Sequence, residues 1–523
     1  MNRSDGGRPV RAGFWAVLLL GIFAWAPAMY PGYWRSLDGF TPIFNAAQPS
    51  AIATIATAAD FWRGAGSAAF LLVEPFEVLR IDPTTSVRFV FAICLILGGL
   101  GVYAWLAPRL GDRPAGLAGL VYMFLPVFLS TIYIRGNLAD AQIMGLLPVA
   151  LAGAAVYSHH HSPSSAGVLV ISVLWMWRTQ AGIALLATLL LLAYAAFVER
   201  HRITLLIVAV SGLAGLVSLI PLFSIQSQSP VEFADHFVYL HQLLVGGWQT
   251  APSIPGWQDA YPFQLGFVAL VFSALTLWAW RSADGRREAH SFAPLLTFGF
   301  VGAGLILFLS LGASAPLWRL TGAERLLTYP WQIMVLSGVC LAVTAGSLPA
   351  VQRNLNCIPY WAVLVTLCLM GSYPYLTAEF LDYRPPSRPV AVYGQQNDLV
   401  ILEANLVEVQ EQSQARLEVA WQVLQPLPVD YNIFLQALAG EGDDLSVVGQ
   451  LDAQPLGEER AATSWQPGEV LTRTYTVDLS ATEARLALEA GGLRYHFGYY
   501  DWQDGARLPV DGGIDDKLIF YGN

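Results

Sequence analysis

The sequence is short of charge and almost devoid of lysine. Only 13% of its 523 residues are charged, and its single lysine, Lys517, lies near the C-terminus. The other strongly basic residues are arginines, and they form no basic tract of the kind that binds nucleic acid. We therefore expect no nucleic-acid partner. Hydrophobic residues, by contrast, make up 55% of the chain and occur in long blocks.

Cysteine and the common nucleotide-binding and hydrolytic motifs are also scarce. The four cysteines (Cys94, Cys340, Cys357 and Cys368) lie in or beside apolar runs, and none lies in the acidic C-terminal part. We therefore expect no disulfide framework. The sequence contains no Walker loop, no dinucleotide-binding fingerprint and no GxSxG or HExxH motif. Neither an ATP-driven mechanism nor a nucleotide or redox cofactor is expected.

The long apolar runs predict an α-helical polytopic membrane protein. Runs such as FVFAICLILGGLGVYAWLA and LLTFGFVGAGLILFLSLGA are long enough to cross a hydrocarbon core as helices. The run at 167–198 is too long for one upright helix, so we interpret it as two helices that turn at Arg178-Thr179-Gln180. Eleven spans are predicted, at about residues 13–30, 88–107, 115–133, 140–157, 167–178, 180–198, 203–222, 263–281, 292–312, 328–347 and 358–376.

The distribution of arginine predicts the orientation of these spans. Arginines occur before the first span, at 3–11, and then in four further short connections on the same predicted side, at 109–113, 200–202, 281–287 and 353. The positive-inside rule places these connections and the N-terminus in the cytoplasm. Because the number of spans is odd, the C-terminal part then lies outside. We expect a multi-pass protein of the plasma (inner) membrane, with long, aromatic-rich outer loops of the kind that often hold a functional site.

The C-terminal part has a different pattern. From about Arg388, apolar and polar residues alternate in segments such as ARLEVAWQVL and VLTRTYTVDL, which are separated by turn-forming residues. Strands at this spacing predict an antiparallel β-sandwich. We therefore expect a transmembrane domain at 1–378, a linker at 379–389 and an extracytoplasmic sandwich domain at 390–523. Its aromatic residues suit either stacking on sugar rings or the sandwich core, and the core is favoured; they are Trp465, Tyr499, Tyr500 and Trp502.

Ionisable residues near the outer ends of the spans are candidates for function, because charge at membrane depth is costly. The segment YIRGNLADAQIMGLLP joins two spans and contains Arg135 and Asp140. An arginine beside an apolar slot suits a lipid-linked phosphate, since a guanidinium binds phosphate oxygens bidentately. Alternatively, Arg135 and Asp140 pair with each other and only shape the turn. Both interpretations stay open. Further candidates in outer turns and loops are Arg178, His241, Glu324 and Arg325.

Asp38, in SLDGF, is the candidate general base. A carboxylate early in the first outer loop is placed to take a proton from an acceptor hydroxyl, although an ordinary turn residue is the alternative. Asp235, His236 and His241 lie in another outer loop and leave a divalent cation open as a cofactor. Their spacing is not diagnostic, so the sequence assigns no metal ligands.

Several of these motifs resemble one family of membrane proteins. YIRGNLADAQIMGLLPVAL resembles the signature of the 6-pyruvoyl-tetrahydropterin synthase-related membrane proteins, with Asp140 where that family usually has Glu. YLHQLLVGGW, YPFQLG and LLTYPWQIM follow in the family's order, with Gln332 where Arg is usual. The resemblance covers roughly residues 10–376, and the strand-rich tail looks like β-sandwich domains attached to bacterial membrane glycosyltransferases.

That family is similar to the GT-C glycosyltransferases. The resemblance implies transfer of a sugar from a polyprenyl-phosphate carrier to an acceptor on the outer face, with the lipid-linked donor and membrane lipid as partners. The acidic hallmark of the first outer loop maps to Asp38, as a base or metal-assisting carboxylate. The substrate-binding candidates are Arg135, Asp140, Arg178, His241, Glu324 and Arg325. The alternative is a non-catalytic scaffold, or a glycan- or lipid-binding protein, that works with envelope-assembly proteins; the lack of a histidine beside Asp38 favours it.

Overall fold

The chain folds into two units, each built from segments that are distant in sequence. The computed structural model describes residues 11–47, 68–219, 232–394, 398–440, 445–457, 460–511 and 515–522. Unit 1 comprises Met1–Pro31, Pro49–Gln249 and Ser253–Ala378. Unit 2 comprises Gly32–Gln48, Thr250–Pro252 and Glu379–Asn523. Unit 2 therefore joins part of the first predicted outer loop to the C-terminal part of the chain.

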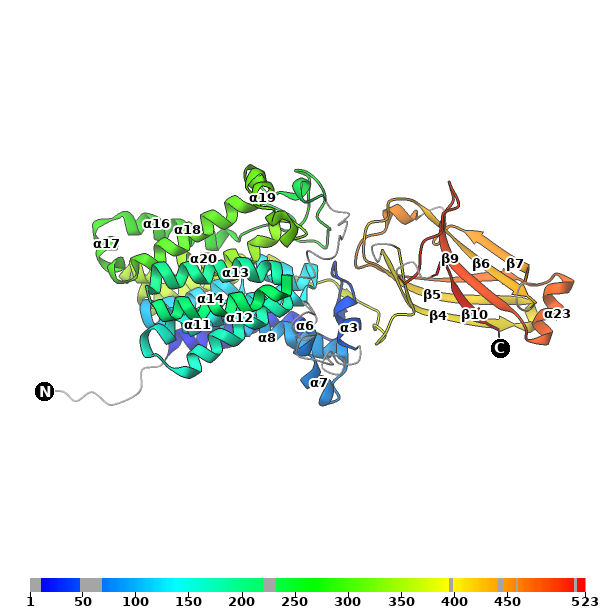
Figure 1. Cartoon of the computed structure of the whole chain (residues 1–523), viewed down its shortest axis with the longest axis horizontal. Coiled ribbons are helices and arrows are strands. Elements are labelled where there is room, and N and C mark those ends of the chain that lie inside the picture. Colours follow the sequence, from blue (N-terminus) through cyan, green and yellow to red (C-terminus); the bar gives the residue numbers. More distant parts are fainter. Residues whose placement is uncertain are drawn as a thin grey trace. The chain divides into compact units, whose positions relative to one another are not determined.

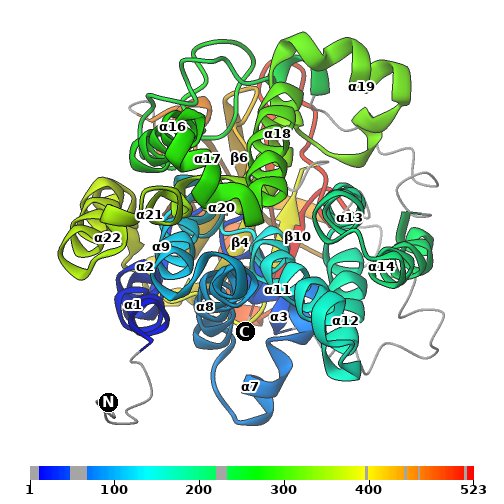
Figure 2. The same ribbon diagram turned by 90° about the vertical axis from the view of Figure 1, so that its left-hand side faces the viewer.

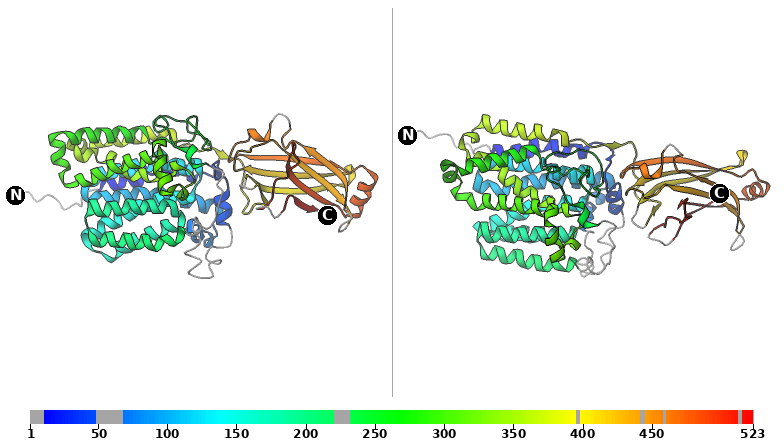
Figure 3. Two further views of the ribbon diagram at one scale, coloured as in Figure 1. Left: turned by 45° about the horizontal axis from the view of Figure 1, so that its top comes forward. Right: turned by 90° about the horizontal axis from the view of Figure 1, so that it is seen from above.

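Unit 1 is a bundle of helices that run roughly side by side (Figures 1 and 3). Within its described residues, eight helical segments are long and apolar enough to cross a membrane. This finding agrees with the predicted helical membrane protein. The eight segments are Ala12–Met29, Pro83–Leu110, Asp112–Arg135, Leu138–His160, Ala181–Glu199, Arg202–Leu219, Ala283–Ser310 and Pro330–Val351.

The remaining predicted spans fall on shorter helices. These are α12 (Pro163–Thr179), α16 (Phe267–Arg281) and α22 (Ile358–Ser372), with 17, 15 and 15 residues. The predicted break near Arg178 is confirmed, because Gln180 is extended (φ −148°, ψ 92°) between α12 and α13 (Ala181–Tyr194). The last three residues of the predicted 203–222 span lie outside the described residues.

The helices in the middle of the bundle are the most completely buried. Viewed end-on, α9 (Asp112–Met123), α11 (Leu138–His160) and α20 (Ser337–Gly346) lie among the other helices (Figure 2). The apolar windows of the segments that contain them are 100%, 72% and 94% buried, against 28% for the segment of α1 (Ala12–Leu20) and α2 (Ile22–Met29). Peripheral helices thus keep apolar side chains on the outside of the bundle, as a membrane protein requires.

The predicted cytoplasmic connections gather at one end of the bundle, which also holds α17 (Ala283–Ala289) (Figure 1). Four contacts join them: the Gly13 amide to Asp112, Arg109 to Glu199, Arg113 to the Asn356 carbonyl, and Arg353 to Glu288. We call this the arginine-rich end. The opposite end holds α6 (Ala68–Leu71), α7 (Glu74–Val78) and α19 (Ala315–Thr321). The arginine-containing connections of the predicted cytoplasmic side therefore lie together at one end of the bundle.

The other helical elements complete unit 1 and connect these helices. They are α8 (Pro83–Leu110), α10 (Pro126–Ser130), η1 (Thr131–Arg135), η2 (Ala195–Glu199), α14 (Arg202–Gly215), η3 (Leu216–Leu219), η4 (Phe233–His236), η5 (His290–Phe292), α18 (Ala293–Ser310), η6 (Gly312–Ser314), η7 (Ala323–Leu326), η8 (Pro330–Leu336), α21 (Leu348–Val351), η9 (Arg353–Asn356) and η10 (Tyr373–Tyr375). The longest of them, α8, begins after Asp82, whose side chain caps the helix by accepting a hydrogen bond from the Thr85 amide.

Unit 2 contains two four-stranded antiparallel sheets, in the orders β10-β9-β6-β7 and β3-β4-β5-β8. Buried residues of both sheets form one hydrophobic cluster, because alternate side chains on each strand face inward. The strands are β3 (Ala391–Tyr393), β4 (Leu399–Val409), β5 (Gln414–Val423), β6 (Tyr431–Ala439), β7 (Ser446–Ala453), β8 (Val470–Asp478), β9 (Arg494–Asp501) and β10 (Leu518–Tyr521).

Several features of unit 2 differ from the sequence-based expectation. Part of the predicted linker forms β2 (Phe380–Leu381), which pairs with β1 (Tyr33–Trp34) in the first predicted outer loop. Helix α3 (Thr41–Ala46) follows β1, and α23 (Thr482–Ala490) interrupts the strands. Among the aromatic candidates, Trp465 and Tyr499 are 2% and 0% exposed and belong to the core.

Candidate functional site

Arg135 and Asp140 meet at a break between two helical segments. The π-helix η1 ends at Arg135, and Gly136 then adopts a left-handed conformation with φ 71°. Glycine suits this position because a side chain with a Cβ is strained there. Asn137 caps α11 by accepting a hydrogen bond from the Asp140 amide at 2.9 Å. This turn brings the two charged side chains together, with Arg135 Nη1 2.5 Å from Asp140 Oδ2.

Both members of this ion pair are buried. Arg135 is 7% exposed and Asp140 is 1% exposed. The second carboxylate oxygen of Asp140, Oδ1, is buried and has no hydrogen-bond partner among the described residues. A buried charge is tolerated when it is paired, and the opposite charge here lies within direct contact. The structure therefore shows the pairing that the sequence left open, and a contact of Arg135 with phosphate stays a prediction.

An aromatic ring, that of Trp331, also contacts the Arg135 guanidinium. Its central carbon lies 5.1 Å from the ring centroid of Trp331, which is a cation–π contact. Trp331 stacks on Tyr261 at 4.4 Å and on Tyr329 at 5.0 Å between ring centroids. Arg135, Trp331, Tyr261 and Phe263 also line a small cavity. The segment LLTYPWQIM thus supplies the aromatic partner of the arginine in YIRGNLADAQIMGLLP.

A cluster of polar residues contacts Trp331 through its indole nitrogen. Ser253 Oγ donates to Asp259 Oδ2 at 2.5 Å and accepts from Trp331 Nε1 at 3.2 Å. It also lies 3.0 Å from His236 Nδ1. Because the Ser253 proton is given to Asp259, the proton in the contact with the histidine belongs to His236 Nδ1. The backbone amide of Tyr261 donates to Asp259 Oδ1 at 2.9 Å.

Burial sets the protonation of this cluster. It raises the pKa of Asp259, although hydrogen bonds from Ser253 and Tyr261 oppose the shift. It lowers the pKa of His236 below its ordinary 6.5, despite the nearby carboxylates of Asp259 and Asp235, so His236 is neutral at neutral pH. The serine lies between the histidine and the aspartate, whereas a hydrolytic triad has the histidine in the middle. We interpret the cluster as a set of bonds that holds Trp331 over Arg135.

Three other candidates lie at the same end of unit 1. Arg178 is 1% exposed in the last turn of α12, directly before the break at Gln180. Glu324, half-buried, and Arg325, exposed, belong to η7. This short helix contacts the start of α13 so closely that a Cβ added to Gly182 would lie 1.8 Å from the Leu326 carbonyl oxygen. The α12–α13 break therefore brings Arg178 and η7 into one region.

The last two candidates are not part of that region. His241 is exposed, with its ring 6.1 Å from that of Tyr239. Asp38 is half-buried in a turn that precedes α3, and this turn belongs to unit 2. The structure thus divides the predicted residues between the units. Within the described ranges, no group of three or more His, Cys, Asp or Glu residues is arranged to hold a metal ion.

The sequence did not predict the roles of Trp331 and Ser253. Trp331 lies in the segment LLTYPWQIM, but its contacts with Arg135 and Ser253 join residues that are far apart in the chain. Ser253 carries no local signal at all, because a serine in a proline-rich loop is common. Both residues are recognised only once the fold brings three segments together.

No family model matches this sequence, and no curated protein matches it either. The resemblance drawn from the motifs therefore stays a prediction, and a function has to be argued from the geometry.

Proposed function

We propose that this protein is a GT-C-like membrane glycosyltransferase. It would transfer a sugar from a polyprenyl-phosphate-linked donor to an acceptor on the outer face of the membrane. The observation that carries the proposal is the placement of Arg135, a buried arginine held between Asp140 and Trp331 beside a small cavity. A guanidinium fixed at the end of a membrane bundle suits the phosphate of a lipid-linked donor.

The candidate residues other than His241 and Glu324 each have a role in this proposal. Asp140 and Trp331 orient Arg135, and Arg178 and Arg325 add positive charge at the same end of unit 1. Asp38 is the general base that removes the proton of the acceptor hydroxyl. A divalent cation is the one cofactor left open, and no nucleotide or redox cofactor takes part. The partners are the lipid-linked donor and membrane lipid.

Asp38→Asn is expected to abolish transfer while leaving the fold intact. An amide cannot accept the proton, and loss of a general base slows a reaction by about 10²–10⁴-fold. The measurement is transfer of radiolabelled sugar from polyprenyl-phosphate donors by purified protein in proteoliposomes. Asp382→Asn, an exposed aspartate of the same unit, is the matched control. Transfer at the wild-type rate by Asp38→Asn would remove Asp38 from the mechanism.

The second candidate function is a non-catalytic scaffold, or a glycan- or lipid-binding protein, of envelope assembly. Two observations favour it. Arg135 already forms an ion pair with Asp140, and Asp38 belongs to unit 2, whereas Arg135 belongs to unit 1. On this alternative, the partners are envelope-assembly proteins. Variants at Asp38 and Arg135 would change stability, and the wild-type protein would consume no lipid-linked sugar.

We further propose a complete topology. The helices α12, α16 and α22 also cross the membrane, which gives eleven spans. The arginine-rich end faces the cytoplasm of a bacterial cell, as the positive-inside rule requires. The two sheets of unit 2 form a β-sandwich outside the plasma (inner) membrane. Their antiparallel order and common hydrophobic cluster support this arrangement.

A native cysteine tests the orientation. Cys357 is exposed at the arginine-rich end, whereas Cys94, Cys340 and Cys368 are buried. A membrane-impermeant maleimide should therefore leave the protein in intact cells unlabelled and should label Cys357 after permeabilisation. A Cys357→Ser variant that also carries Glu411→Cys, at an exposed position of unit 2, should be labelled in intact cells. Labelling of Cys357 in intact cells would reverse the proposed orientation.

A further inference from the structure

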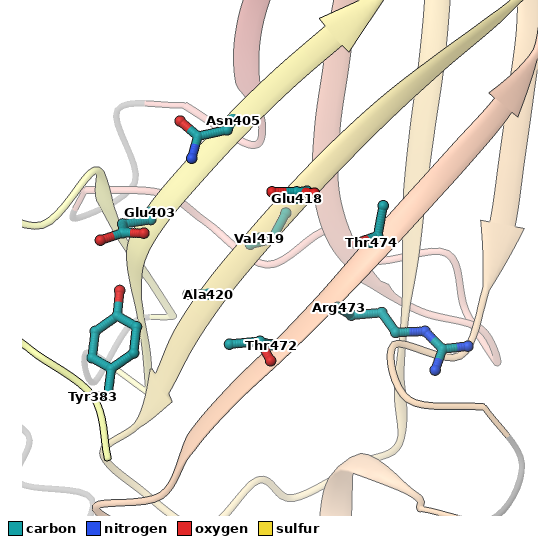
Figure 4. A pocket seen from close by; sticks show the side chains of 9 residues that line it. All are labelled: Tyr383, Glu403, Asn405, Glu418, Val419, Ala420, Thr472, Arg473 and Thr474. Atoms are coloured by element: carbon teal, nitrogen blue, oxygen red, sulfur yellow. The ribbon is translucent and has the colours of Figure 1, made fainter. Parts of the chain in front are cut away.

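Unit 2 contains a groove that the proposed function does not use. The groove has a volume of about 600 Å³ and lies over strands β4, β5 and β8, with Tyr383 at one end (Figure 4). The described residues that line it all belong to unit 2. The groove is therefore a feature of this unit alone.

Two rows of side chains build the groove across the three strands. Asn405 pairs with Glu418, which pairs with Thr474 on the next strand. The second row is Glu403, Ala420 and Thr472. The rows lie two residues apart along each strand, or about 7 Å, and alternate residues of a strand share one face of the sheet. Ala420 is small and leaves room between its two neighbours.

A β-bulge in β4 directs two of these side chains into the groove. Before the bulge, Leu399 and Ile401 face the hydrophobic core; after it, Ala404 and Leu406 pack on that core. The pairing register shifts between Ile401 and Glu403, so the extra residue reverses which face each following side chain occupies. Glu403 and Asn405 consequently face away from the core. Bulges are frequent where a sheet presents functional side chains.

The groove presents hydrogen-bonding groups and negative charge. Glu403 and Glu418 supply carboxylates, Asn405 supplies an amide, and Thr472 supplies a hydroxyl. The one cationic residue among those that line the groove, Arg473, extends away from the others (Figure 4). Two carboxylates without a facing cation disfavour phosphates, nucleic acids and other anions. They suit a neutral ligand that is rich in hydroxyl groups.

Tyr383 completes one end of the groove. Its hydroxyl points toward the Glu403 carboxylate (Figure 4). Burial raises the pKa of Tyr383, and the Glu403 carboxylate raises it further, so the phenol keeps its proton and can donate a hydrogen bond. The aromatic ring offers an apolar face on which a sugar ring can stack.

We propose that this groove binds a neutral saccharide chain, with Glu418, Glu403 and Asn405 as the residues that recognise its hydroxyl groups. Adjacent hydroxyls of a sugar match the paired oxygens of a carboxylate and the donor and acceptor of an amide. A hydrogen bond to a charged group is also stronger than one between neutral groups. This binding does not require the protein to be an enzyme.

The groove also adjoins the segment that carries Asp38. The Phe40 ring stacks on that of Tyr383 at 6.2 Å between centroids, and the Phe40 amide donates to Gln422 on β5 at 2.8 Å. The turn with Asp38 therefore packs beside the Tyr383 end of the groove. This step rests on the proposed function. The bound saccharide is then the acceptor, and its terminal hydroxyl would approach Asp38.

Saccharide binding is tested with the full-length protein in detergent and without any lipid-linked donor. The probes are neutral hexasaccharides of glucose, mannose, galactose and arabinose, with a polygalacturonate hexamer as the anionic comparison. We expect saturable binding of at least one neutral probe and none of the anionic one. Glu418→Gln should weaken binding about tenfold or more, because it removes a charged hydrogen-bond acceptor. The measurements are titration calorimetry and saturation-transfer NMR.

Matched variants make this test decisive. Glu418 is exposed, so its replacement leaves the core unchanged, and Glu411→Gln makes the same chemical change at an exposed site outside the groove. Glu411→Gln should bind as the wild type does, and Asn405→Ala should bind more weakly. Absence of saturable binding by every neutral probe would overturn the proposal, as would equal binding by Glu418→Gln. Failure of sugar transfer in the separate donor assay would leave this binding result unaffected.

Discussion

Replacing Asp140 with alanine is expected to destabilise unit 1 by about 3–5 kcal/mol. The change removes the directly contacting carboxylate from a buried charge, since Arg135 is only 7% exposed. Bilayer and apolar side chains around this end cannot solvate the guanidinium as water does. The measurement is the yield of monodisperse protein and its melting temperature in detergent. Wild-type values for Asp140→Ala would contradict a stabilising role for the pair.

A double substitution separates the two interpretations of this pair. In Arg135→Met combined with Asp140→Leu, both charges are replaced by apolar groups of similar size, which is often neutral or stabilising. We expect this variant to recover most of the stability that Asp140→Ala loses. If it also transferred sugar normally, the pair would only shape the turn. If it folded but no longer bound polyprenyl phosphate, Arg135 would be the phosphate contact, as proposed.

Gly182→Ala is expected to have the second-largest effect. A Cβ at this position would lie 1.8 Å from the Leu326 carbonyl oxygen and 2.8 Å from its carbonyl carbon. These are backbone atoms, which cannot rotate away, so α13 and η7 would have to separate by more than 1 Å. Overpacking of this kind costs about 3 kcal/mol. It would also displace Glu324 and Arg325, which belong to η7.

A second glycine provides the control for this experiment. Gly304 lies in α18, and a Cβ there would have no atom within 4 Å. Gly304→Ala should therefore be neutral or slightly stabilising, since alanine favours a helix by about 1 kcal/mol over glycine. Comparing the melting temperatures of the two variants separates the effect of the steric clash from the general effect of replacing glycine with alanine. Equal melting temperatures for both variants would show that η7 is not packed against α13.

Long apolar runs predicted the long helices of unit 1. The length of the run at 167–198, together with its polar residues near the middle, located the break at Gln180. These signals are local, because span length follows from membrane thickness and charge is excluded from the hydrocarbon core. Alternation predicted strands such as β5 and β8 for the same reason, since it requires only neighbouring residues.

Contacts between distant segments could not be predicted in this way. Nothing in SLDGF indicates that Phe40 bonds to Gln422, although this contact helps to place the Asp38 turn in unit 2. The bulge in β4 changes the face of the sheet on which Glu403 lies. The sequence carries no signal for this bulge, because the bulge depends on the pairing of β4 with β5. Arg135 and Asp140 were found because they are close in sequence, whereas Trp331 and Ser253 needed the folded chain.

We propose that this protein acts on a lipid-linked sugar. The most direct test is the consumption of polyprenyl-phosphate-linked sugar by the wild-type protein in proteoliposomes, with a neutral oligosaccharide as acceptor. We expect release of polyprenyl phosphate together with a lengthened oligosaccharide, and loss of both products in Asp38→Asn. Stable, folded wild-type protein that consumed none of the common hexose or pentose donors would contradict the claim and leave the non-catalytic alternative.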